Sequence, residues 1–216
     1  MPIVLSGLLL ALLVMLLFGG TEFDGGLLML LHVEGQPALA TLGTIAEQAT
    51  QPLILAAMGG AGAGYLAMRR QWRGALLAIA ITTGALLLVA YLGDITSSLR
   101  PGRAERMLPT QTSLFPNGAA AGAAAIWLGL AFLLTRHRPW RAIWTSLAVF
   151  LALAAGILQL VGGLAWPSDV IGGWALGLFW TLLLLWLAGE DIGDGTPRPR
   201  ANDKVEEADL PRLKEK

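Results

Sequence analysis

The chain has no cysteine and just two histidines, His32 and His137, and only 14% of its 216 residues are charged. Without cysteine there can be no disulfide and no thiolate metal site. No phosphate-binding loop, dinucleotide fingerprint or zinc-ligand spacing occurs, so we expect neither a metal nor a cofactor. The basic residues form no stripe of the kind that nucleic-acid binding requires, so we also expect no nucleic-acid partner.

Long uncharged runs are the main feature that is present. Hydrophobic residues make up 55% of the chain, and an uncharged run of about 18 residues or more is a candidate transmembrane helix. The runs predict an all-α integral membrane bundle of six helices, at about residues 2–19, 52–68, 75–93, 119–135, 142–164 and 170–188. No base precedes the first run and no good cleavage site follows it, so we expect a retained helix rather than a signal peptide.

Two segments differ from the apolar runs. Residues 21–51 contain four acids and no base, and their apolar clusters are too short to span a bilayer. We predict an interfacial amphipathic segment in two pieces, broken at residues 35–37. Residues 190–216 are charged and contain three prolines, which predicts a disordered cytoplasmic tail after a membrane domain at residues 1–189.

The distribution of Lys and Arg predicts the orientation. Six spans place both termini on one side of the membrane, and cytoplasmic loops collect basic residues. Twelve of the 15 Lys and Arg fall on one side if both termini are cytoplasmic; the remaining three are Arg100, Arg103 and Arg106. We therefore predict both termini inside, in the inner membrane of a bacterium.

Pairs of glycines four residues apart predict close helix packing in two of the spans. One pair is Gly60 and Gly64, and the other is Gly118 and Gly122. Small residues at this spacing allow helix backbones to approach closely in lipid.

Polar residues at span ends predict a site on the outer, periplasmic face. Arg100 follows the third span, Gly118 opens the fourth and Asp169 opens the sixth. A charge at a span end is by default a functional hypothesis. The alternative is that Arg100 and Asp169 pair with each other or reach water by snorkelling.

The sequence around these residues resembles that of the type 2 phosphatidic acid phosphatase family, also called the PAP2 or lipid phosphate phosphatase family. The first family motif is Lys, six residues, then Arg-Pro; this chain has Gly93 at the lysine position and then Arg100-Pro101. The second is Pro-Ser-Gly-His, and the sequence here is Pro116-Asn117-Gly118-Ala119. Together with the third motif, described next, these matches follow the order of the family. They support the six-span fold of the family, with the motifs on the outer face.

The third motif is Ser-Arg, five residues, His, three residues, Asp. It resembles Leu158-Gln159, Ala165 and Asp169 of this chain, and the following Val170, Gly173 and Trp174 are also similar to the family. The resemblance implies that Asp169 is a retained motif acid. It also implies that two alanines, Ala119 and Ala165, stand where the family has its histidines.

The chemistry implied by the resemblance requires those histidines. In the family the third-motif histidine attacks phosphorus, the aspartate orients it, and the second-motif histidine protonates the leaving alkoxide. Lysine and two arginines offset the charge of the transferring phosphoryl group. Alanine can neither attack nor donate a proton, so we expect no catalytic residue and no phosphatase turnover by the family mechanism.

Several functions stay open. The first is a pseudo-phosphatase that binds a lipid or isoprenoid phosphate at the outer leaflet through an anion pocket of Arg100, Gly118, Asn117, Arg103 and Arg106. The second is a membrane scaffold that binds a membrane-protein partner or a second copy of the chain. The third is an active phosphatase for phosphatidic acid or undecaprenyl pyrophosphate with a rewired site, for which His32 is the one outer-face histidine. Transport has little support, because the spans lack a chain of buried acids and bases.

Overall fold

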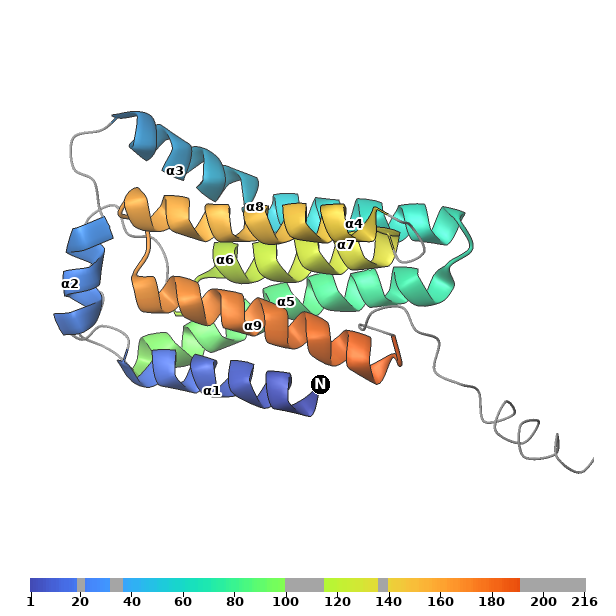
Figure 1. Ribbon diagram of the computed structural model, residues 1–216, viewed down its shortest axis with the longest axis horizontal. Helices are drawn as coiled ribbons and strands as arrows, with labels where there is room; N and C mark the ends of the chain where they lie inside the picture. Colours follow the sequence, from blue (N-terminus) through green and yellow to red (C-terminus); the bar gives the residue numbers. More distant parts are fainter. Residues whose placement is uncertain (19–21, 32–36, 100–114, 136–139, 191–216) are drawn as a thin grey trace, which may run out of the picture.

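The computed structural model describes residues 1–18, 22–31, 37–99, 115–135 and 140–190. The described residues form helices and no strand, which confirms the predicted all-α class. Figure 1 shows long helices lying side by side as a bundle, with α2 and α3 at one end of it. In chain order the helices are α1 Pro2–Phe18, α2 Glu22–Leu31, α3 Pro37–Ala49, α4 Pro52–Met68, α5 Trp72–Leu99, α6 Gly118–Gly122, the π-helical turn η2 Ala123–Trp127, α7 Leu128–Thr135, α8 Arg141–Val161 and α9 Pro167–Leu187.

Four helices within the described part of the chain are long and apolar enough to cross a membrane. They are Trp72–Thr96, the continuous helix Gly118–Thr135, Arg141–Val161 and Pro167–Leu187. Two shorter apolar helices, Pro2–Leu17 and Pro52–Met68, correspond to the first and second predicted spans. The predicted segment between them forms two separate helices, α2 and α3, as the break at residues 35–37 indicates.

The predicted ends of the last two spans are each wrong by three residues. Helix α8 ends at Val161 rather than at residue 164, because Gly163 adopts a positive φ of 70° that L side chains rarely adopt. Helix α9 begins at Pro167 rather than at residue 170, with proline in its first turn, where its missing N–H costs nothing. Asp169 therefore lies inside the first turn of α9.

Helix α9 packs through two of its glycines against the helix formed by α6, η2 and α7. A Cβ on Gly173 would lie 2.5 Å from the main-chain oxygen of Asn117, and one on Gly177 would lie 2.3 Å from that of Ala121. Between these contacts and α7, the helix widens into the π-turn η2, where Thr181 Oγ1 donates to the Ala125 carbonyl at 3.1 Å. Backbone contact of this kind holds α9 directly against the start of α6.

The close packing predicted for the glycine pair in α4 is wrong, because the pair lies on a face of the helix that contacts no other helix in the described residues. A Cβ on Gly60 or Gly64 would meet nothing within 4 Å, whereas Gly59 and Gly62 abut Thr82 and Leu130. Both glycines of the other pair are closely packed, because a Cβ on Gly122 would collide with Leu55 and one on Gly118 would lie 3.0 Å from Val89 Cγ1.

Candidate functional site

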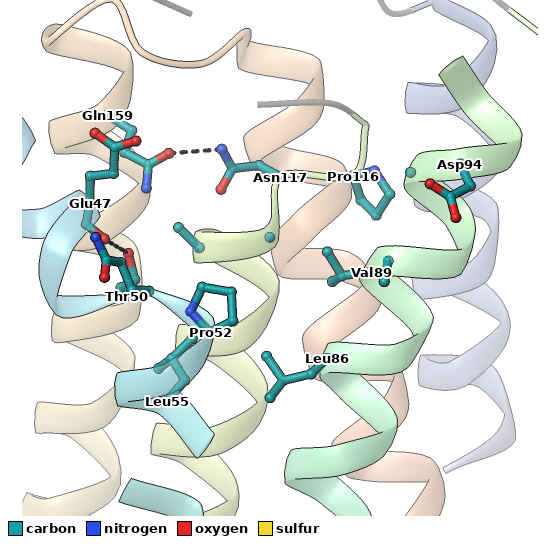
Figure 2. Close-up of a pocket in the computed structure, with 15 residues that line it drawn as sticks. Glu47, Thr50, Pro52, Leu55, Leu86, Val89, Asp94, Pro116, Asn117 and Gln159 are labelled. Carbon is teal, nitrogen blue, oxygen red and sulfur yellow. Dashed lines mark hydrogen bonds between the residues drawn. The ribbon is translucent and has the colours of Figure 1, made fainter. Parts of the chain in front are cut away.

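A pocket of about 510 Å³ lies where five helices meet at one end of the bundle. The end of α3, the beginning of α4, the second half of α5, the beginning of α6 and the last turn of α8 all contribute to its wall (Figure 2). Its lining residues are Glu47, Thr50, Gln51, Pro52, Leu55, Leu86, Val89, Ala90, Gly93, Asp94, Pro116, Asn117, Gly118, Ala119 and Gln159. Four of the sequence-predicted motif positions, Gly93, Asn117, Ala119 and Gln159, are therefore brought together here, with Gly118 beside them.

Asn117 and its neighbour Phe115 join the motif segments that the structure describes around this pocket. Its Oδ1 accepts from the Ala120 N–H at 2.8 Å and caps α6, while its Nδ2 donates to Gln159 Oε1 at 2.8 Å. Its own N–H donates to the main-chain oxygen of Asp169 at 2.9 Å. Phe115, two residues before Asn117, is tied to α5, since Thr96 Oγ1 donates to the Phe115 carbonyl at 2.6 Å. Such a network fixes the end of α5, the start of α6, the last turn of α8 and the first turn of α9 in one arrangement.

Gln159, which the motif resemblance sets opposite a family arginine, is 3% exposed. Its oxygen is used by Asn117, but its Nε2 has no hydrogen-bond partner in the part of the chain that the structure describes. An amide contributes a neutral N–H donor in place of a guanidinium charge. Gln159 therefore gives this corner of the pocket a neutral donor and no positive charge.

The two alanines that the resemblance aligns with the family's histidines lie in different surroundings. Ala119 is half-buried and lines the pocket. Ala165 is 0% exposed and packs with Ala120, Leu160 and Val170, and Trp174 closes over this cluster. Ala165 is not part of the pocket wall; it lies in close apolar packing instead.

Asp169 is buried at 0% exposure in the first turn of α9. It is held from both sides of its backbone, because its N–H donates to the Trp166 carbonyl at 3.0 Å and its carbonyl accepts from Asn117. The residue next to it, Ser168, is held by a helix far away in the sequence. Asp24 of α2 accepts from the Ser168 N–H at 3.0 Å and from its Oγ at 2.7 Å.

The Asp24 contact was not predicted from the sequence. Asp24 appeared there as one of four acids in an interfacial segment, and nothing local indicates its partner 144 positions away. Its side chain is 4% exposed. A carboxylate at this place acts as an N-terminal cap of α9, supplied by another helix.

Charge in the pocket is acidic as far as the structure describes it. Glu47 and Asp94 line the wall, and none of the described lining residues is Lys, Arg or His. The predicted anion ligands Arg100, Arg103 and Arg106 lie outside the described residues, as do His32 and His137, so the alternative in which Arg100 pairs with Asp169 stays open. Within the described part of the chain, no three His, Cys, Asp or Glu side chains lie together in a way that could hold a metal ion.

The sequence of the chain matches a protein family and a characterised relative. Residues 71–192 match the family model described as the PAP2 superfamily. The chain is 30% identical to phosphatidylglycerophosphatase B of Bacillus subtilis over 121 residues, which is 54% of this chain and spans 59% of that protein.

The fold also matches a solved structure. This is the crystal structure of a transmembrane PAP2-type phosphatidylglycerolphosphate phosphatase from Bacillus subtilis, with a TM-score of 0.70, 23% identity, and coverage of 89% of this chain and 98% of that one. The family model matches more than half of the chain and includes α5 to α9, the helices that carry all three motif segments. The chain is an integral membrane protein of the PAP2 superfamily.

Proposed function

We propose that this chain is a catalytically inactive PAP2 protein, which binds a lipid at the family's site without hydrolysing it. The observation that carries the proposal is the packing of Ala165. Its methyl group cannot attack phosphorus, and its place at 0% exposure among Ala120, Leu160 and Val170 leaves no room for another side chain to attack from there.

The rest of the pocket supports the same conclusion. Ala119 lacks a proton for the leaving group, and Gly93 and Gln159 lack the charges that would stabilise a transferring phosphoryl group. The pocket nevertheless stays open at about 510 Å³ and keeps an apolar wall of Leu55, Leu86 and Val89. A cavity with apolar walls and a few polar groups is typical of ligand binding.

The ligand proposed from the sequence is a lipid or isoprenoid phosphate of the outer leaflet. The N-terminus of the helix Gly118–Thr135 borders the pocket, and helix N-termini favour anions. Arg100, Arg103 and Arg106 would supply the positive charge in this proposal. It further assumes six spans in a bacterial inner membrane, both termini and the tail 190–216 in the cytoplasm, and the pocket on the periplasmic side, as the distribution of basic residues favours.

An active phosphatase is the second candidate, and the similarity to phosphatidylglycerophosphatase B favours it. One experiment separates the two. The protein, purified in detergent, is given phosphatidate, phosphatidylglycerophosphate and an isoprenyl pyrophosphate, and both bound lipid and released phosphate are measured. The proposal predicts saturable binding of at least one of these lipids with no phosphate release above a protein-free control. Phosphate release that is abolished by Asp169→Ala would establish the second candidate instead.

A further inference from the structure

The orientation of the Gln159 amide follows from its neighbours. Ala120 donates its N–H to Asn117 Oδ1 at 2.8 Å, so Asn117 must turn its nitrogen toward Gln159. Gln159 must then accept with its oxygen, and its nitrogen is directed elsewhere. In Figure 2 the Gln159 oxygen faces Asn117 and the nitrogen points away from Asn117. A buried amide N–H without a partner costs free energy, so this corner favours a ligand that brings an acceptor.

Glu47 lies on the same side of the pocket as Gln159. Helices α3 and α8 pack so closely that a Cβ on Gly43 would be 3.1 Å from the Leu158 carbonyl, and Glu47 follows Gly43 by one helical turn. Both Glu47 and Gln159 line the pocket. A carboxylate has about four lone-pair sites, so Glu47 can accept from a ligand while it keeps another contact.

An N–H donor beside a carboxylate acceptor selects the chemistry of the ligand. A phosphate oxygen accepts from Gln159 but brings its negative charge toward Glu47, and an ammonium group donates to Glu47 but cannot accept from Gln159. A hydroxyl group does both at once. We propose that Gln159 and Glu47 form a hydroxyl subsite, so that the lipid in this pocket carries a free hydroxyl group at its polar end.

The inference rests on the proposed function, because it assumes that the pocket holds a lipid without cutting it. The apolar wall of Leu55, Leu86 and Val89 accommodates the hydrocarbon next to the polar corner. Two kinds of lipid present such a hydroxyl. One is a phospholipid with a polyol headgroup, and the other is a lipid alcohol such as diacylglycerol.

Matched lipid pairs test the subsite on the full wild-type chain in detergent micelles. Phosphatidylglycerol is compared with phosphatidylpropanol, which has the same charge and chain but lacks the headgroup hydroxyls. Diacylglycerol is compared with its 3-O-methyl ether. We expect the hydroxyl-bearing member to bind about fivefold to tenfold more tightly in at least one pair, the effect of one or two net hydrogen bonds. The pair that shows the preference identifies the source of the hydroxyl.

A variant assigns the preference to the subsite. Gln159→Met keeps the length of the side chain and removes the donor, and should abolish the preference while phosphatidylpropanol or the methyl ether still binds. Gln48→Met, on the exposed side of α3, is the matched control and should keep the preference. Equal affinity of the wild type for both members of both pairs overturns the hydroxyl subsite but leaves the proposed function standing. Failure of all four lipids to bind likewise overturns the hydroxyl subsite, and the proposed function is overturned only if the three lipid phosphates named above also fail to bind.

Discussion

Removal of the Asp24 carboxylate should release the beginning of α9. Asp24 accepts two hydrogen bonds from Ser168, at 3.0 Å from the N–H and 2.7 Å from the hydroxyl, and it is buried. Asp24→Ala leaves a buried N–H and a buried hydroxyl without this partner. It also removes a negative charge from the N-terminal end of a helix 21 residues long.

The expected loss can be estimated from these contacts. A hydrogen bond to a charged group contributes about 1.5–3 kcal/mol, and loss of an N-cap costs about 0.5–2 kcal/mol. The hydrogen bond from the Ser168 N–H is included in both values, so they cannot simply be added. We expect Asp24→Ala to lower the free energy of unfolding by about 2–4 kcal/mol. Asp24→Asn keeps an acceptor for the N–H and loses the charge, and should cost about 1 kcal/mol.

A double-mutant cycle isolates this contact from any other made by Asp24. Unfolding of the wild type, Asp24→Ala, Ser168→Ala and the double variant is followed in mixed micelles by tryptophan fluorescence. The coupling energy between the two side chains should be about 1–2 kcal/mol. Amide exchange at the first turn of α9 should rise in Asp24→Ala. Ser6→Ala, whose hydroxyl makes a local bond on an exposed face of α1, is the control and should change stability by less than about 0.5 kcal/mol. A coupling energy near zero, with unchanged exchange at Ser168, would refute the reasoning.

Three further substitutions test the packing around the pocket, each by the same unfolding measurement. Asn117→Ala removes the cap of α6 and the bond to Gln159, and should cost about 1–3 kcal/mol; a loss below 0.5 kcal/mol contradicts the network described here. Gly177→Ala places a methyl group 2.3 Å from a carbonyl oxygen and should cost about 1–3 kcal/mol, whereas Gly64→Ala, with nothing within 4 Å, should not destabilise the protein; equal effects would exclude close backbone contact at Gly177. Ala165→His forces an imidazole into a filled cluster and should cost about 1–3 kcal/mol without restoring phosphatase activity; unchanged stability would show that the nucleophile position is open.

The sequence predicted the helices well because their main signal is local. Uncharged apolar runs identified α1, α4 and α5, and the motif residues predicted that Asn117, Ala119 and Gln159 lie at one end of the bundle. The errors in the ends of α8 and α9 also have local causes, a glycine with positive φ and a proline in a first turn. The apolar run continues past Gly163 to Leu164, and at the other end the charge of Asp169 set the predicted start of the sixth span after that residue.

Side-chain contacts between distant segments could not be predicted in the same way. The hydrogen bond from Ser168 to Asp24 joins two distant segments, and nothing in the sequence of either segment indicates that they are in contact. The face of α4 that packs inward depends on its neighbours, so the spacing of Gly60 and Gly64 indicated a contact that Gly59 and Gly62 make instead. The separation of Ala119 from Ala165, one lining a cavity and the other in a packed cluster, likewise depends on how α8, α6 and α9 meet.

The most direct test of the account is a search for a phosphorylated enzyme. The purified protein is incubated with lipid phosphate labelled with ³²P, quenched rapidly, and examined for label on the polypeptide and for free phosphate. We predict neither, because the chain has Ala165 at the nucleophile position and Ala119 at the proton donor. Label that stays on the polypeptide through denaturation, and disappears in Asp169→Ala, would contradict the central claim that this PAP2 protein binds without catalysis.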